Sequence, residues 1–461
     1  MKNSLLIRKT RIIDPSSRTD MIGDILILNN EIAEIRKEIR ESEIPIDCAV
    51  VEGEGLIACP GFIDLHCHLR EPGYEDKETI LTGSQAAAKG GFTTICCMPN
   101  TNPPIDNAAM VHFIKGKSIE ANLVRVLPIG CVSKGRAGLE LAEMWEMAEA
   151  GVIGFSDDGN PVGNPNLMRQ ALSYAKMLNV PIIDHCEEQT LTKNAVVNEG
   201  AVSNRLGLKG WPNEAEESMV ARDIALAELT GGKLHLAHIT TAYSVELVAA
   251  AKKRGVQVTA ETTPHHMTLT ENWVLGHKHS KESIQFLGPD AYNPTTKVNP
   301  PLRTEQDRQA LVNGIREGII DAIATDHAPQ TFMGKVDTYT SAEWGISGLE
   351  TALSSLLGLV HKGELDLMTL VTRLTTGPIS ILGTSYEEIG SLRKGTTADI
   401  VLFDPDRKWV VKAGEFASKG KHSPLEGIEL RGKLVLSIVA GKPIYSSIDK
   451  IKIEVEEKMN E

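Results

Sequence analysis

The sequence predicts an α/β fold in which a (β/α)8 TIM barrel carries a small β-sandwich domain built from both chain ends. From about residue 60, apolar strand-like runs alternate with helix-like stretches, which is typical of parallel strands joined by helices. Short strands separated by turns replace this alternation at both ends. Because one barrel takes about 250 residues, we divide the 461 residues into a first sandwich segment (1–58), the barrel (59–379) and a second sandwich segment (380–461).

The two end segments share one pattern. Branched apolar residues alternate with polar ones in LLIRKTRIID, GDILILNNEIAEI and AVVEGEGLIAC, and again in GSLRKGTTADIVLFD, KWVVKAG and GIELRGKLVLSIVAGKPIY. A period of two is the period of a β-strand with one buried face. The similarity of the two ends suggests that they form one domain.

The central region contains eight apolar runs with helix-like stretches between them. These runs are GFIDLHCH (61–68), FTTICCM (92–98), VRVLPIG (124–130), GVIGFSD (151–157), PIIDHC (181–186), LHLAH (234–238), QVTAE (257–261) and IDAIATD (320–326). Their nearly continuous apolar character fits parallel strands that are covered on both faces. Eight strand-then-helix units predict a closed barrel.

One helix shows the boundary signals most clearly. In TAYSVELVAAAKKRG the apolar positions recur at helical spacing, Lys252, Lys253 and Arg254 fill the last turn, and Gly255 follows. Basic residues near a helix C-terminus and a glycine just past it are both favourable.

Composition limits the class of protein. The chain is 41% hydrophobic and 24% charged, which rules out disorder as its main state. Its formal net charge of −13, without a block of basic residues, argues against a nucleic-acid partner. Seven cysteines without a CxxC pair fit a reducing cytoplasm, and we expect no signal peptide and no membrane span.

Metal-binding side chains fall at the ends of four of the predicted strands. They are His66 and His68 after the first run, His185 after the fifth, His238 after the sixth and Asp326 after the eighth. Barrel active sites lie at the C-terminal ends of the strands, so these five side chains should meet. Buried structural histidines are the alternative explanation. Imidazole and carboxylate ligands suit Zn²⁺, and other first-row metals remain possible.

Two acidic positions could extend this centre. Asp326 can act as ligand and as base, although an aspartate there could also cap a helix. Asp157 or Asp158, after the fourth run, could bridge two ions roughly 3.5–4 Å apart.

Arg70 in HLREPG and Asn100 in CMPNTNPP follow the first and second runs, where they could bind a carboxylate.

A set of motifs then carries a family resemblance. The motifs are DLHCHLREPG, MPNTNPPIDN, GFSDDGNP, DHCEE, AHITTAYSVEL, PHHMTLTE, KVNPPLR, ATDHAP and GISGLETAL. Together they resemble the dihydroorotases of the amidohydrolase superfamily, in their longer bacterial type, over nearly the whole chain. HLREPG followed by MPNTNPP distinguishes this family from the similar allantoinases and dihydropyrimidinases.

The resemblance implies a reversible reaction, the cyclisation of N-carbamoyl-L-aspartate to L-dihydroorotate in pyrimidine (UMP) biosynthesis. It implies one or two Zn²⁺ ions held by His66, His68, Asp158, His185, His238 and Asp326, with Asp158 where many amidohydrolases have a carboxylated lysine. Asp326 would move the proton. The expected substrate contacts are His68, Arg70, Asn100, Asn299, Gln330, Trp344 and Gly345. A homodimer and a complex with aspartate carbamoyltransferase are partners that the resemblance suggests.

Two positions depart from the family pattern. The family usually has histidine four residues after the catalytic aspartate, in DHAPH, whereas this chain has DHAPQ with Gln330. Gln330 can donate a hydrogen bond but carries no charge. Trp344 stands where phenylalanine is expected. Two other functions stay open: a related cyclic amidohydrolase (allantoinase, hydantoinase or dihydropyrimidinase), which Gln330 motivates, and a non-catalytic partner of aspartate carbamoyltransferase.

Overall fold

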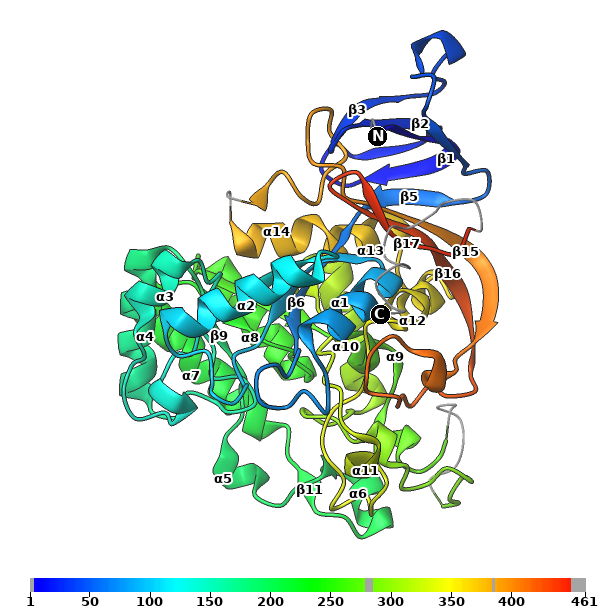
Figure 1. Cartoon of the computed structure of the whole chain (residues 1–461). Coiled ribbons are helices and arrows are strands. Elements are labelled where there is room, and N and C mark those ends of the chain that lie inside the picture. The colour runs from blue at the N-terminus through cyan, green and yellow to red at the C-terminus, as the bar shows by residue number, and fades with distance from the viewer. Residues whose placement is uncertain (1–3, 278–284, 384–385, 449–461) are drawn as a thin grey trace.

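The computed structural model describes residues 4–277, 285–383 and 386–448. A closed barrel of parallel strands forms the body of the molecule, and a sheet made from the two chain ends lies beside it (Figure 1). The predicted fold class is therefore confirmed. The boundaries at residues 58 and 379 stay predictions, and residues 449–461 of the last predicted segment lie outside the described residues.

Among the described residues, seven strands and one residue that forms isolated bridges, Phe155, make the barrel wall. The strands are β6 (Phe62–Cys67), β7 (Phe92–Cys97), β8 (Arg125–Pro128), β9 (Ile182–Asp184), β12 (Leu234–Leu236), β13 (Val258–Thr262) and β14 (Ala322–Ile323). They pair in parallel as β6–β7–β8 and as β9–β12–β13–β14. A parallel bridge between Cys67 and His327 closes the ring.

The fourth predicted run is shorter than expected. Instead of a strand, Phe155 alone bridges Gly130 on one side and Ile182 on the other. Its N–H donates to Pro181 O, and its C=O accepts from Ile183 N. The run still fills the fourth place in the wall, and Asp157 and Asp158 follow directly.

The helices alternate with the barrel strands and cover them. They are α1 (Ile80–Gly90), α2 (Ala108–Ala121), α3 (Met144–Ala150), α4 (Pro165–Leu178), α7 (Glu214–Thr230), α8 (Ala242–Lys253), α10 (Glu305–Glu317) and α12 (Ala352–His361). Helix α8 matches the boundary signals, because Thr241 caps its first turn, Lys252 and Lys253 end it, and Gly255 adopts a left-handed φ of 81°.

Shorter elements occupy the loops and the last part of the barrel region. They are α5 (Gln189–Thr192), β10 (Val197–Asn198), α6 (Ala201–Leu206), β11 (Gly210–Trp211), α9 (Pro264–Thr268), α11 (Phe332–Lys335), α13 (Leu367–Leu374) and α14 (Thr376–Leu382). Most of them follow a strand, so they lie in the loops that surround the strand ends.

The chain ends form one eight-stranded sheet. Its strands are β1 (Ser4–Asp14), β2 (Thr19–Leu28), β3 (Glu31–Arg36), β4 (Ala49–Glu52), β5 (Ile57–Pro60), β15 (Ile400–Val410), β16 (Glu429–Val439) and β17 (Lys442–Ser446). β5 joins the two halves because it pairs with both β1 and β15. Apolar side chains from both halves share one core, and α12 packs against β16.

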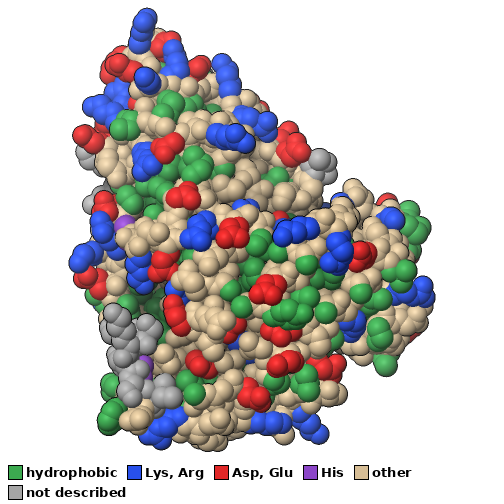
Figure 2. Space-filling view, turned by 180° about the vertical axis from the view of Figure 1, so that it is seen from behind, with side chains coloured by type: hydrophobic (Ala, Val, Ile, Leu, Met, Phe, Trp, Pro, Cys, Tyr) green, Lys and Arg blue, Asp and Glu red, His purple; other side chains and the backbone are tan. Residues whose placement is uncertain are grey.

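The surface carries both signs of charge. On the face drawn in Figure 2, acidic and basic side chains are interspersed. None of the described helices is long and apolar enough to cross a membrane.

Candidate metal centre

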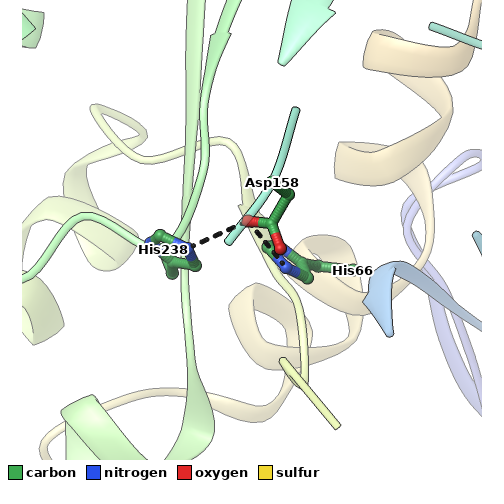
Figure 3. A group of neighbouring side chains, drawn as sticks. All are labelled: His66, Asp158 and His238. Carbon is green, nitrogen blue, oxygen red and sulfur yellow. Dashed lines mark ion pairs between the residues drawn. The ribbon is translucent and has the colours of Figure 1, made fainter. Parts of the chain in front are cut away.

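Six predicted ligand side chains meet at one buried point, and Asp158 lies at its centre. Its Oδ1 atom lies 3.4 Å from a ring nitrogen of His66, 3.5 Å from one of His238 and 3.6 Å from one of His185, and its Oδ2 atom lies 3.6 Å from Nε2 of His68. Figure 3 shows the Asp158 carboxylate between His66 and His238. Asp326 completes the group, with Oδ1 3.1 Å from Nε2 of His68.

The donor atoms fit a metal ion. They form two overlapping groups, His66–Asp158–His238 and His66–His68–Asp326, in each of which the ligand atoms lie within 4.8 Å of one another. Among the described residues, His66 Nε2 and Asp158 Oδ1 are buried without a hydrogen-bond partner. Such unpaired buried atoms are costly, and a cation between them would satisfy both. His66 belongs to both groups.

The backbone is strained at three of the predicted residues. Arg70, His238 and Asp326 adopt positive φ angles of 64°, 31° and 44°. A non-glycine residue in this region costs about 1–3 kcal/mol, and such strain is concentrated at functional sites. The rings of His66 and His68 still lie side by side in an edge-on arrangement, with centroids 5.3 Å apart, although the strand pairing is irregular between Asp64 and Cys67.

The structure distinguishes Asp157 from Asp158, which the sequence left as alternatives. Asp157 turns away from the histidines and accepts hydrogen bonds from the backbone N–H groups of Val132 and Ser133, both at 3.0 Å, and from the Ser133 hydroxyl. Asp158 is therefore the carboxylate that can bridge ions, whereas Asp157 holds the preceding loop.

Three of the four histidines have a hydrogen-bonding partner on the ring nitrogen that does not contact Asp158. His66 Nδ1 lies 2.9 Å from Glu261 Oε1, His185 Nε2 lies 3.0 Å from Glu187 Oε2, and His68 Nδ1 lies 3.0 Å from Asn100 Oδ1. Partners of this kind fix the orientation of a metal-binding imidazole.

Two carboxyl groups of the site are held ionised. Burial opposes ionisation of Glu261, but contacts with His235 and His66 outweigh it and lower the pKa of Glu261 to about 2. Burial is likewise outweighed at Asp326, where the contact with His68 and the charge of His66 hold the pKa below its usual range. Asp326 is thus held in the carboxylate form.

Among the predicted substrate contacts, Asn100 and Asn299 are linked to this centre, the first through His68 and the second through Glu187. Arg70 is half-buried, and its Nε donates to Pro329 O at 3.3 Å. Asn100 contacts His68, as described, and Nδ2 of Asn299 lies 3.5 Å from Glu187 Oε2. The Asn299 Oδ1 atom is buried without a partner among the described residues.

Gln330 is tied to the loop that carries Trp344 and Gly345. Its side-chain Nε2 donates to Trp344 O at 2.7 Å, and its backbone N–H donates to His422 Nε2 at 3.0 Å. Gly345 N donates to Lys297 O at 3.0 Å. Glycine is required there, because φ is 109° and a Cβ atom would lie 2.4 Å from Ala328 O.

Two buried lysines hold the same loop. Lys335 Nζ donates to Glu343 O at 2.7 Å and to Lys297 O at 3.2 Å. Lys297 Nζ donates to Ala342 O at 2.6 Å and lies 4.5 Å from the centre of the Trp344 ring. The backbone between residues 335 and 345 is therefore fixed by ammonium groups.

We expect Lys335 to make stability rise with pH. Burial lowers its pKa to about 7 in the folded protein, whereas an unfolded lysine has a pKa of about 10.4. Between these values the unfolded chain binds the extra proton, so raising the pH favours folding by up to about 1.4 kcal/mol per unit. Lys335→Met removes this contribution. Urea unfolding of both proteins at about pH 7.5 and 9.5 measures it, and equal pH slopes would contradict the expectation.

Several residues of the site were not predicted as part of it. Glu261 ends the seventh apolar run and Glu187 follows the fifth, so both occupied the strand-end positions that could have identified them. His422, in contrast, comes from a loop between β15 and β16. Its contact with Gln330 spans 92 residues, and no local pattern indicates it.

Comparison with solved structures shows the fold, and comparison with closer relatives shows the family. The fold resembles that of the L-hydantoinase (dihydropyrimidinase) of Arthrobacter aurescens, with a TM-score of 0.84, 23% identity and 98% of both chains covered. It also resembles the dihydropyrimidinase of Brevibacillus agri, with a TM-score of 0.79 and 22% identity over 96% of this chain and 95% of that one. At this level of identity the likeness shows the fold, which is the one that these hydantoinases and dihydropyrimidinases adopt.

The family follows from closer relatives. Residues 55–244 match the family described as Dihydro-orotase-like. The chain is 45% identical to the dihydroorotase of Syntrophus aciditrophicus over 96% of its own length and 99% of that protein. It is 44% identical to the dihydroorotase of Aquifex aeolicus with the same coverage. The chain belongs to the dihydroorotase family.

Proposed function

We propose that this protein is a zinc-dependent dihydroorotase, which interconverts N-carbamoyl-L-aspartate and L-dihydroorotate plus water in pyrimidine biosynthesis. The observation that carries the proposal is the contact of Asp158 with all four histidines at the mouth of the barrel, in a chain of the dihydroorotase family. A cytoplasmic location, a homodimer and a complex with aspartate carbamoyltransferase rest on the family resemblance.

Zinc suits the donor set. The candidate ligands are imidazole nitrogens and carboxylate oxygens, which Zn²⁺ prefers. Zinc in such a site supplies Lewis acidity, which polarises an amide carbonyl and makes water acidic near neutral pH. We propose one or two ions per chain, held by His66, His68, Asp158, His185, His238 and Asp326.

The protein's own groups bind the substrate and move the proton. In ring opening, water adds to the ring amide carbonyl, the C–N bond breaks, and Asp326 passes the water's proton to the leaving nitrogen. Arg70 and Asn100 bind the substrate carboxylate, because a guanidinium can form paired charge-assisted hydrogen bonds with it. Asn299 and the backbone near Trp344 and Gly345 position the ring. Ring closure reverses these steps.

Gln330 supports a second candidate, the hydrolysis of a related cyclic amide. A neutral amide at this position binds a substrate carboxylate more weakly than a histidinium, since charge-assisted hydrogen bonds are about twice as strong. The test is a substrate panel with zinc-loaded protein. We expect turnover of dihydroorotate to exceed that of hydantoin and allantoin, and a preference for either of these would replace the proposal.

We expect Gln330→His to leave kcat nearly unchanged and to lower KM for dihydroorotate about fivefold. An added charge at this position strengthens one hydrogen bond to the substrate by about 1 kcal/mol. Steady-state kinetics measures both constants, with Gln330→Leu as the control that loses the donor and raises KM. A higher KM in Gln330→His would show that the contact of Gln330 with Trp344 matters more than charge.

A further inference from the structure

Glu261 is a buried carboxylate that the proposed reaction does not use. It lies in β13, is 1% exposed, and directs Oε1 toward Nδ1 of His66 at 2.9 Å. His66 comes from β6, so this contact joins the first and seventh places in the barrel wall. Because a carboxylate only accepts, Nδ1 of His66 must carry the ring hydrogen. Nε2 is then left as the atom that faces Asp158, 3.4 Å away.

A second histidine holds Glu261 from the other side. Nε2 of His235 lies 3.2 Å from Glu261 Oε2, an ion-pair contact whose angles do not meet those of a hydrogen bond. His235 is itself fixed, because its Nδ1 lies 2.9 Å from the Thr259 hydroxyl on the neighbouring strand. His235 pairs with Thr259 in the register of β12 and β13. Glu261 therefore lies in contact with two imidazoles, one on each carboxylate oxygen.

The contact between Glu261 and His66 involves the histidine that both candidate metal groups share. His66 belongs to the group with Asp158 and His238 and to the group with His68 and Asp326. A carboxylate bonded to the far nitrogen of a metal-binding imidazole fixes its orientation and increases its basicity. We propose that Glu261, held by His235, is a positioning residue that sets the tautomer and orientation of His66 for both metal sites. This inference rests on the proposed metal centre.

The cost of burying Glu261 supports this role. A carboxylate that is almost fully buried against two imidazoles adds little net stability, since replacing a whole buried ion pair by apolar groups is often neutral or stabilising. If Glu261 served only to stabilise the fold, its replacement would lower the stability of the protein and leave metal affinity unchanged. If Glu261 positions His66, its replacement lowers the affinity of the protein for the metal.

The test measures Zn²⁺ binding by metal-free protein in competition with a chelating dye, without substrate. We expect Glu261→Gln to lower zinc affinity about 10- to 100-fold. His235→Gln should give an affinity between those of wild type and Glu261→Gln. Zinc affinity of Glu261→Gln within twofold of wild type would overturn the inference.

Asp399→Asn is the matched control. Asp399 is also a 1% exposed carboxylate, but it pairs with Arg125 at the first residue of β8, the end of that strand away from the metal centre. This variant should lose stability and keep its zinc affinity. Equal loss of affinity in Asp399→Asn would show that any buried charge in the barrel has the same effect, which would also overturn the inference.

A measurement on the unaltered protein covers the case in which Glu261→Gln does not fold. Nitrogen-15 NMR of metal-free wild type should show the His66 ring hydrogen on Nδ1, protected from solvent exchange and assigned by its absence in His66→Gln. A ring that carries its hydrogen on Nε2 and none on Nδ1 would contradict the inference. Wild type that binds no zinc would overturn the metal centre together with it, which separates the two failures.

Discussion

Asp326→Asn should keep its zinc and lose turnover, with kcat for dihydroorotate falling about 10²- to 10⁴-fold. The asparagine retains an oxygen at the position of Oδ1, which lies 3.1 Å from His68 Nε2 and 3.6 Å from His66 Nε2. An amide cannot accept the proton that a carboxylate accepts. Zinc per chain, measured by atomic absorption, and kcat, measured by ring opening, together check this result.

The control for this variant is Asp321→Asn. Asp326 lies shortly after β14, and Asp321 directly precedes that strand, at the end away from the metal centre. There its carboxylate pairs with Lys252 Nζ at 2.7 Å. We expect unchanged kcat and zinc content there. Retained turnover in Asp326→Asn would remove Asp326 from the role of base.

Asp158→Asn should lose zinc. Its carboxylate contacts a ring nitrogen of every histidine of the centre, and its Oδ1 is buried without a partner among the described residues. Loss of the negative charge leaves four imidazoles and one carboxylate around the ions. We expect the affinity for at least one Zn²⁺ ion to fall more than about 100-fold, because outer partners alone change it by about 10- to 100-fold.

Asp157→Asn separates the two neighbouring carboxylates. Asp157 bonds to the Val132 and Ser133 backbone, so its amide should cost about 1–3 kcal/mol of stability while zinc binding stays intact. Chemical denaturation and zinc titration of both variants measure the difference. If Asp157→Asn lost zinc and Asp158→Asn kept it, the assignment of the bridging carboxylate would be reversed.

The sequence predicts most of the barrel because its signals are local. Each apolar run corresponds to one place in the barrel wall, and the histidines stand where parallel strands end. The fourth run is the exception, since only Phe155 forms bridges there. Apolar residues alone do not determine how many ladder bonds a short segment makes.

The family resemblance implied Asp158, but strand positions in the sequence could not choose between Asp157 and Asp158, because adjacent residues in an irregular segment have no fixed side. The choice depends on the Val132–Ser133 backbone, which binds Asp157 from 24 and 25 residues away. The contact of His66 with Glu261 spans 195 residues, and only the closed barrel brings them together. Contacts of this kind require the three-dimensional fold.

The most direct test of the metal-centre account is a zinc titration of metal-free protein, followed at each step by the rate of dihydroorotate ring opening. The account predicts no turnover without metal and a linear rise in rate that ends at one or two zinc ions per chain. Carbamoyl aspartate should be cyclised by the same zinc-loaded protein. Zinc-loaded protein that neither opens dihydroorotate nor cyclises carbamoyl aspartate would contradict the account.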